Sequence, residues 1–341
     1  MRILLVSPGN NQKYGGGFFY AFHRRLINGF IRAGHFVYPY SDRDTADYAL
    51  GVRAIGRRLA NRRLIEIAAE LKPDLVVLLL SYLIEPETVR RVREVAKGVK
   101  VAAICIDDIG HDKPAAQFRF LLQEADVGFA TTGGETLARF ASLRPVAFIP
   151  NPVDTSIDDQ RAFAASPVET DIFFACHQPM EDPRWQRVEA LRARLTGRGR
   201  RFGLHGNFAT PLTGDRFVAA LGRAAIGLNL NRRDGDLYAS DRMAQFLGNG
   251  LLLATRRASG YDAVFSDDEM LFFDDTDDLA VGIERVLAAG EPWRAMARAG
   301  REKALRLMNE TVVCRFIVDF AMAGRAPSDW AFTKHMVDRR A

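Results

Sequence analysis

The chain of 341 residues is too long for one ordinary domain and long enough for two. Apolar residues make up 48% and charged residues 26% of it, and no run approaches the ~20 apolar residues of a membrane-spanning helix, so we expect no transmembrane segment. The formal net charge of +5 is modest and no aromatic residues are interleaved with the basic ones, so a nucleic-acid partner is not expected.

In the first half, short runs rich in Val, Ile, Leu and Phe alternate with longer amphipathic segments, which predicts the strands and crossover helices of a parallel sheet. The predicted strands are 2–6, 35–38, 75–80, 101–106, 127–130 and 146–149. The predicted helices are 17–33, 55–71, 86–97, 115–124 and 134–141. The first apolar run breaks at Pro8, too early for the apolar region of a signal peptide, so we expect a cytoplasmic protein.

The alternation stops at residues 149–154 (IPNPVD) and restarts at Asp171. The second set of predicted strands is 171–175, 202–205, 225–230, 251–254 and 270–273, and the predicted helices are 183–196, 214–223, 239–247 and 277–288, with two more in 291–322. We therefore predict an α/β protein with two Rossmann-like domains facing across a cleft, where ligands of such folds bind. The predicted parts are residues 1–155, residues 156–310, and a helical segment, residues 311–341, that returns towards the first domain.

Cysteine and arginine usage bounds the possible partners. The three cysteines, Cys105, Cys176 and Cys314, stand singly in apolar surroundings and are predicted core residues, with no spacing suited to zinc or a disulfide framework. Positive charge is concentrated in two clusters, residues 53, 57, 58, 62 and 63 and residues 198, 200 and 201. These clusters are either solvated helix faces or sites for a phosphate-rich partner or an anionic membrane surface.

A glycine run follows the first predicted strand. Gly15, Gly16 and Gly17 precede a predicted helix, so their bare backbone amides and the positive helix end could face a phosphate or a sugar. The full dinucleotide-binding fingerprint is missing, and no acidic residue ends the second strand. A flexible loop without a ligand is the alternative.

Residues 106–111 (IDDIGH) bring two carboxylates and an imidazole to the end of a buried strand. Burial can raise the pKa of a carboxyl group towards the range of a general base, so Asp108, followed by His111, is the candidate catalytic base. The alternative is that Asp107 or Asp108 only caps the next helix or lines a solvated loop.

Asp234 and Asp236 have the carboxylate-x-carboxylate spacing that can place Mg²⁺ or Mn²⁺ on a diphosphate, but Asp-Gly is also common turn chemistry. The neighbouring Arg232 and Arg233 could neutralise a diphosphate without a metal. We therefore expect neither a metal nor another cofactor.

Residues 240–250 (SDRMAQFLGNG), followed by 251–255 (LLLAT), predict a capped helix that ends in a Gly-Asn-Gly turn and leads into a buried strand. This segment resembles the nucleotide-binding helix of GT-B glycosyltransferases, particularly the group-1-like transferases that include the CgeB-type proteins. Segments with the order and spacing of other parts of that family are 125–129, 150–154, 170–174, 225–229, 265–273 and 277–279. The resemblance therefore spans nearly the whole chain.

The resemblance implies a nucleotide-sugar donor held mainly by the C-terminal domain. The expected donor-binding residues are Gly15, Gly16, Gly17, His177, Arg184, Arg187, His205, Asn229, Asn231, Ser240, Arg242 and Gln245. Gln245 stands where such transferases usually carry a glutamate that binds the donor ribose, and an amide can both donate and accept there. The resemblance implies that a retaining transferase would carry a second glutamate within residues 232–239, and none is present there. Whether the sugar is transferred with retention or with inversion therefore stays open.

The predicted function is metal-independent transfer of a sugar to a glycan, a lipid-linked acceptor or another cell-envelope acceptor, in the cytoplasm or at the inner face of the membrane. An alternative is a GT-B protein that binds a nucleotide or glycan without turnover, which the missing glutamate at Gln245 favours. A two-domain ligand binder of the periplasmic type has the same architecture but would need an export signal.

Overall fold

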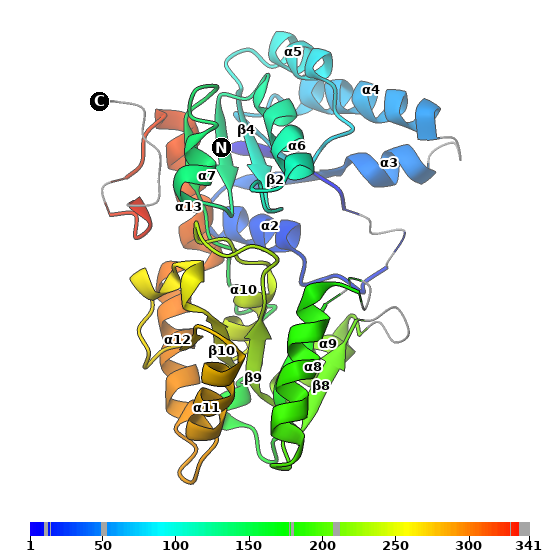
Figure 1. Ribbon diagram of the computed structural model, residues 1–341. Coiled ribbons are helices and arrows are strands. Elements are labelled where there is room, and N and C mark those ends of the chain that lie inside the picture. The colour runs from blue at the N-terminus through cyan, green and yellow to red at the C-terminus, as the bar shows by residue number, and fades with distance from the viewer. Residues whose placement is uncertain are drawn as a thin grey trace. The chain divides into compact units, whose positions relative to one another are not determined.

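The computed structural model describes residues 1–9, 13, 15–48, 53–176, 178, 181–206, 212–327 and 329–333. The chain forms two compact units, one made of Met1–Pro152 and Glu310–Ala341 and the other of Val153–Asn309 (Figure 1). The first crossing between the units thus lies close to the boundary that we placed after residue 155, and the chain re-enters the first unit at Glu310.

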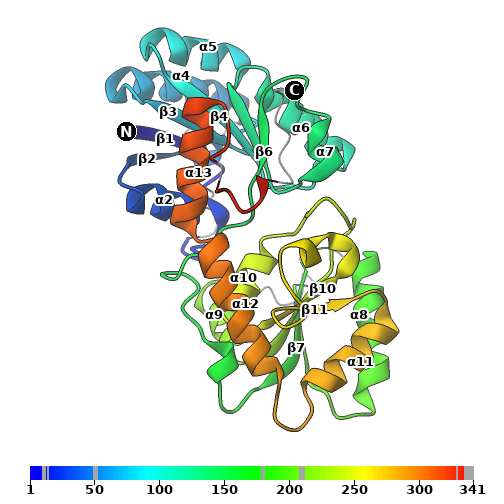
Figure 2. The ribbon, with the colours of Figure 1, turned by 90° about the vertical axis from the view of Figure 1, so that its left-hand side faces the viewer.

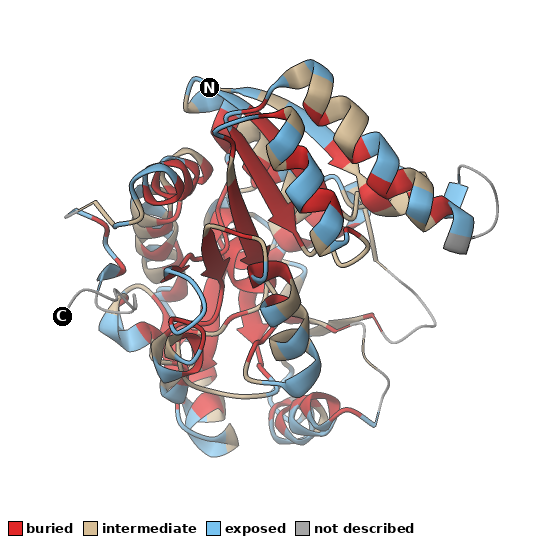
Figure 3. Ribbon diagram, turned by 90° about the horizontal axis from the view of Figure 1, so that it is seen from above, coloured by how far each residue is buried: buried red, intermediate tan, exposed pale blue. Residues whose placement is uncertain are grey.

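The first unit contains a six-stranded parallel sheet in the order β2-β1-β3-β4-β5-β6. Its strands are β1 (Arg2–Ser7), β2 (Phe36–Ser41), β3 (Leu75–Leu79), β4 (Lys100–Cys105), β5 (Val127–Ala130) and β6 (Val146–Phe148). Strands β3 and β5 are buried along their whole length, as the red strands of Figure 3 illustrate. Burial on both faces explains why these strands are continuous apolar runs rather than alternating ones.

Helices cover both faces of this first sheet (Figure 2). On one face lie α2 (Phe22–Arg32) and α13 (Glu310–Ala323), and on the other lie α4 (Arg53–Leu71), α5 (Pro86–Val95), α6 (Asp112–Leu122) and α7 (Gly134–Ala138). Gly29 allows α2 to approach α13, because a Cβ there would lie 2.4 Å from the carbonyl oxygen of Glu310. The C-terminal helix α13 is therefore an integral part of the first unit.

Two details of the first unit differ from the sequence prediction. The helix predicted at 17–33 begins only at Phe22, because the described residues before it form turns. An additional helix, α3 (Asp42–Tyr48), was not predicted, because its sequence DRDTADY has no apolar periodicity. It packs on α4, where a Cβ on Gly56 would collide with the carbonyl oxygen of Ala46.

The second unit contains a five-stranded parallel sheet in the order β11-β10-β9-β7-β8. Its strands are β7 (Thr170–Ala175), β8 (Phe202–His205), β9 (Ala224–Asn229), β10 (Leu252–Arg256) and β11 (Leu271–Phe273). Helices α8 (Pro183–Thr196) and α11 (Thr276–Val286) pack together on one face, and α10 (Arg242–Gly248) and α12 (Trp293–Leu307) pack together on the other (Figure 2). Helix α9 (Asp215–Gly222) connects β8 to β9. All the strands predicted for both halves of the chain are present.

The cysteines are buried, and several of the clustered arginines form ion pairs. Cys105, Cys176 and Cys314 are free and buried, which confirms their prediction as core residues. In the cluster at 198–201, Arg200 pairs with Glu284 at 2.9 Å and Arg201 with Asp171 at 2.7 Å. On α4, ion pairs engage three of the clustered arginines, Arg57, Arg62 and Arg63. Among the described residues, no helix is long and apolar enough to cross a bilayer.

Candidate functional site

The carboxyl ends of β7 and β9 form a topological switch point in the second sheet. From β7 the chain passes first to β8 on one side and then to β9 on the other, and open α/β sheets bind ligands outside the strand ends at such a point. A pocket of about 530 Å³ lies there. It is lined by Gln178, Glu181, Asp182, Pro183, Arg184, Arg187, Asn231 and Arg232.

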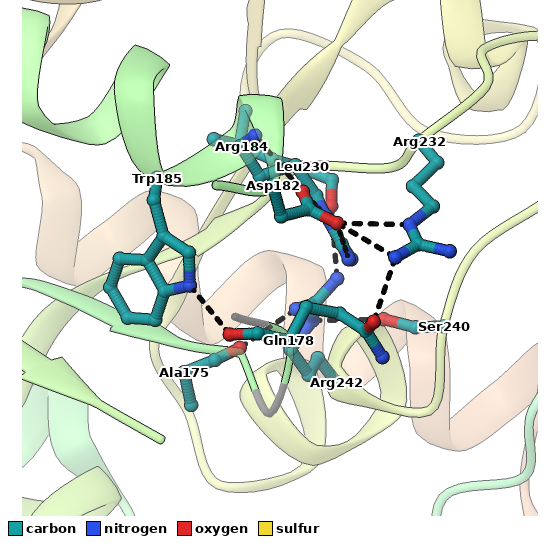
Figure 4. Close-up of polar contacts among 9 residues, drawn as sticks. All are labelled: Ala175, Gln178, Asp182, Arg184, Trp185, Leu230, Arg232, Ser240 and Arg242. Carbon is teal, nitrogen blue, oxygen red and sulfur yellow. Dashed lines mark hydrogen bonds and ion pairs between the residues drawn. The ribbon is translucent and has the colours of Figure 1, made fainter. Parts of the chain in front are cut away.

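Asp182 binds two of the arginines that line this pocket, Arg184 and Arg232 (Figure 4). It is the N-cap of α8, and its Oδ1 accepts hydrogen bonds from the backbone nitrogen of Arg184 at 3.1 Å and from Arg184 Nε at 2.7 Å. Its Oδ2 accepts from Arg184 Nη2 at 2.9 Å and from Arg232 Nε and Nη2 at 3.0 and 2.9 Å. Hydrogen bonds from Arg184, with help from Arg232, hold the pKa of Asp182 well below its usual range. A carboxylate with its acceptor positions so fully used is not a general base.

Three arginines give the pocket its positive charge. Arg184 is nearly buried, whereas the Arg232 side chain is 50% exposed and also donates from Nη2 to Gln178 Oε1 at 2.7 Å. Gln178 is held in turn, because Trp185 Nε1 donates to its carbonyl oxygen at 3.0 Å. Arg187 is exposed and makes no hydrogen bond or ion pair with any residue that the structure describes. Its guanidinium is therefore free to bind an anion.

Arg242, which we predicted to bind the donor, contacts the protein backbone. It is buried, and it donates from Nη1 to the carbonyl oxygen of Ala175 at 2.7 Å and from Nη2 to that of Leu230 at 2.9 Å (Figure 4). Its Nε donates to Ser240 Oγ at 2.9 Å, and burial lowers its pKa. Arg242 thus connects the end of β7 to the residue after β9, and its donor-binding role stays a prediction.

Two asparagines lie at the carboxyl end of β9: Asn229 is the last residue of the strand and Asn231 is two residues further on. Asn229 donates from Nδ2 to Thr255 Oγ1 at 3.3 Å and accepts from Ser240 Oγ at 3.4 Å. Asn231 donates to the carbonyl oxygen of Tyr238 at 2.8 Å, while its buried Oδ1 has no partner among the described residues. Asn231 lines the pocket, but this oxygen itself is buried.

Among the predicted donor residues that the structure describes, Gln245, His205 and the three glycines are not part of the pocket lining. Gln245 is on α10, 4% exposed, and donates to Asp241 Oδ2 at 3.2 Å. His205 ends β8 beside the Phe173 ring, with centroids 5.0 Å apart, and burial lowers its pKa. In the first unit, a Cβ on Gly15 or Gly16 would meet nothing within 4 Å, and Gly17 is part of the same turn. His177 lies outside the described residues.

The predicted Asp234 and Asp236 pair faces separate partners. Arg256 Nη1 lies 2.5 Å from Asp234 Oδ2, and Arg233 Nη1 lies 3.1 Å from Asp236 Oδ2. In the described part of the chain, no group of three or more His, Cys, Asp or Glu side chains is placed to hold a metal ion.

In the first unit, Asp108 and His111 are neighbours at the end of β4. Asp108 is 5% exposed and accepts a hydrogen bond from the backbone nitrogen of Gly110 at 2.9 Å, which stabilises the turn. His111 Nε2 lies 3.6 Å from Asp108 Oδ2, and the imidazole is 49% exposed. The arrangement is an accessible imidazole next to a buried carboxylate, at a distance slightly longer than a hydrogen bond.

Sequence reasoning missed Gln178, Glu181 and Asp182 as pocket residues. The signal for Asp182 was readable, because Asp followed by Pro is a typical start of a helix. Its connection to Arg232 was not readable, because it depends on the order of the strands.

Comparison with known proteins places this geometry in a fold family. Residues 184–310 match a protein-family model described as glycosyl transferase-like. The Anabaena HepE protein, solved with UDP and glucose, is 10% identical over 95% of this chain and 100% of its own, with a TM-score of 0.60. The α,α-trehalose 6-phosphate synthase of Burkholderia multivorans is 11% identical over 95% and 98%, with a TM-score of 0.59. An α-glucosyltransferase solved with UDP and a 13-mer DNA is 12% identical over 94% and 100%, with a TM-score of 0.61.

The chain has the GT-B fold. This confirms the fold that the sequence resemblance implied, while the CgeB-type subfamily stays a prediction. No curated protein sequence matches the chain. Within this GT-B chain, the matched segment begins at Arg184 and includes Arg187, Arg232 and Gln245.

Proposed function

We propose that this GT-B chain is a glycosyltransferase whose nucleotide-sugar donor places its diphosphate in the pocket at the switch point of the second sheet. The observation that carries the proposal is the presence of Arg184, Arg187 and Arg232 in the lining of one pocket. Guanidinium groups bind phosphate oxygens through charge-assisted, often bidentate hydrogen bonds. The glycosyl transferase-like match over residues 184–310 and the similarity to structures solved with UDP support the same ligand class.

The charge of the diphosphate is neutralised by side chains in this proposal. Asp182 caps α8, so a backbone amide at the start of this helix is already hydrogen-bonded. Arg187 and the exposed part of the Arg232 side chain therefore supply the positive charge. As the sugar bond breaks, negative charge builds up on the leaving diphosphate, and fixed cations stabilise it. Asp234 and Asp236 are each paired with an arginine, which supports transfer without a metal ion.

Activity in the presence of a chelator tests the metal-free mechanism. We expect sugar transfer to continue in EDTA, because the pocket arginines are the counterions. Loss of transfer in EDTA with rescue by Mn²⁺ would assign Asp234 and Asp236 to a metal site and contradict this part of the proposal.

The acceptor side of the reaction is assigned to the first unit. We propose that His111 removes the proton of the acceptor hydroxyl and that Asp108 orients its imidazole. The proposed acceptor is a glycan or a lipid-linked sugar of the cell envelope, reached in the cytoplasm. Of the arginines on α4 whose side chains are described, Arg58 is the one without a partner, so it is the residue available to an anionic membrane surface.

A thermal-shift screen against a panel of nucleotide sugars tests the donor assignment. A ligand present at ~100 times its Kd stabilises the folded state by roughly 2.7 kcal/mol, so the correct donor raises the melting temperature. We expect one nucleotide base to be preferred across several sugars, because the nucleoside diphosphate is the shared part. A panel in which no compound raises the melting temperature would contradict the proposal.

The second candidate function is binding without turnover, and the amide at Gln245 favours it. Release of nucleoside diphosphate from the stabilising donor separates the two functions, because transferases commonly hydrolyse their donors slowly. We expect release. Tight binding without any release, with and without acceptor extracts, would support the binding protein.

A further inference from the structure

We infer that Asp182 is a positioning residue that fixes Arg232 for the donor diphosphate, an inference that rests on the proposed function. Asp182 begins α8 after β7, and Arg232 follows β9, 50 residues later in the chain. One carboxylate therefore connects the two chain segments that flank the switch point (Figure 4).

The contacts of Asp182 use one edge of each arginine. Nε and Nη2 of Arg184 and Nε and Nη2 of Arg232 all donate to the carboxylate, at distances between 2.7 and 3.0 Å. In both arginines, Nη1 makes no hydrogen bond or ion pair with a described residue. The donor phosphate can therefore bind the Nη1 groups without displacing the carboxylate.

The ion pair with Asp182 holds the Arg232 side chain in one conformation before the ligand binds. The Arg232 side chain is 50% exposed, and a long exposed side chain loses conformational freedom when a ligand immobilises it. Asp182, whose own side chain is 3% exposed, removes that freedom before the ligand arrives, and Gln178 Oε1 adds a second fixed acceptor for Nη2. Binding of the diphosphate then does not include the entropic cost of ordering Arg232.

An opposite role for Asp182 makes an opposite prediction. If its carboxylate competed with the phosphate for the arginines, removing its charge would tighten anion binding. If it positions Arg232, removing it weakens binding although the pocket becomes more positive. Glu181 provides the matched control, because it lines the same pocket, is exposed, and has no contact with a described arginine.

The test is calorimetric titration of UDP and GDP into the wild type, Asp182→Asn, Arg232→Gln, the double variant and Glu181→Gln. We expect each of the first two substitutions to weaken binding of the preferred nucleotide about tenfold, and the double variant to be no more than about tenfold weaker than wild type, because both remove one coupled contact. Glu181→Gln removes the same charge from the same pocket without removing an arginine contact, so it should bind the nucleotide more tightly than wild type does.

Three results would overturn the inference. Losses that multiply to about a hundredfold in the double variant would show that Asp182 and Arg232 act independently, and tighter binding by Asp182→Asn would show competition. A wild type that binds neither nucleotide nor any sugar of the panel would contradict the proposed function as well, so the two failures can be distinguished. If Asp182→Asn folds poorly, Asp182→Ser keeps an N-cap side chain and still removes the ion pair.

Discussion

Gln245 Nε2 donates a hydrogen bond to Asp241 Oδ2 at 3.2 Å, at the start of α10. Gln245 is 4% exposed, whereas Asp241 is exposed, so the amide of a buried side chain binds a carboxylate that is still in contact with solvent. A glutamate at this position, the residue usual in similar transferases, would place a second negative charge next to Asp241. The amide and the aspartate are therefore compatible with each other in a way that two carboxylates are not.

The first prediction follows from this pair. Gln245→Glu should lower the free energy of unfolding at pH 7 by about 1–3 kcal/mol, because it places a carboxylate at a buried position and replaces the hydrogen bond to Asp241 by a like-charge contact. Urea unfolding measures the change, and the double variant Asp241→Asn with Gln245→Glu should recover most of it. Equal stability of wild type and Gln245→Glu would show that the two side chains are not coupled. Donor affinity of the rescued variant measures whether a glutamate at position 245 binds the donor more tightly than the amide does.

The second prediction concerns Arg242. Arg242→Met should destabilise the protein by about 3 kcal/mol, because it leaves the carbonyl oxygens of Ala175 and Leu230 without their donor. Thermal or urea unfolding checks this, with Arg58→Met as a control for an exposed arginine, which should change stability by less than about 0.5 kcal/mol. A variant as stable as wild type but deficient in donor binding would return Arg242 to the ligand contacts that the sequence suggested.

The third prediction is a dependence of stability on pH. The pKa of Asp182 is held below its unfolded value, so its contribution to stability is present above the ordinary aspartate pKa and is lost as the pH falls towards the depressed folded value. The wild type should therefore lose more stability between pH 5 and pH 3 than Asp182→Asn does. Urea unfolding at both pH values gives the comparison, and identical losses would mean that the ion pair does not stabilise the folded state.

The fourth prediction assigns the base. His111→Ala should lower kcat by at least ~100-fold while the calorimetric affinity for the donor stays constant, since the acceptor proton is the one it removes. Asp108→Asn should have a smaller effect on kcat, because that residue orients the imidazole and does not take the proton. The reverse ranking would make Asp108 the base, and turnover close to wild type in both variants would place the base elsewhere.

The sequence predicted well what depends on local pattern. Apolar runs bounded by Gly, Pro or polar residues identified the strands, and α8 has the predicted bounds Pro183–Thr196, with Asp182 and Pro183 at its start. Helix α3 escaped prediction, since DRDTADY has no apolar periodicity and its helix is stabilised by packing on α4. Tertiary contacts of this kind leave no trace in a local pattern.

The candidate site divides in the same way. Arg184 and Arg187 were predicted because they lie in the first turns of a helix that follows a strand. The contact between Asp182 and Arg232 depends on β9 lying next to β7, which the order of elements along the chain does not reveal. The backbone contacts of Arg242 could not be predicted for a related reason, because whether an arginine contacts backbone carbonyls depends on how the chain folds around it.

If the pocket arginines bind the diphosphate of a nucleotide sugar, substitution of Arg187 should weaken that binding without disturbing the fold. Arg187 is exposed and has no partner among the described residues, so Arg187→Met should leave stability within about 0.5 kcal/mol of wild type. Calorimetric titration of the preferred nucleoside diphosphate should show binding to the wild type and at least about tenfold weaker binding to Arg187→Met, because a charge-assisted contact is lost. Equal affinity of the two proteins for that nucleotide, or no binding by the wild type, would contradict the account.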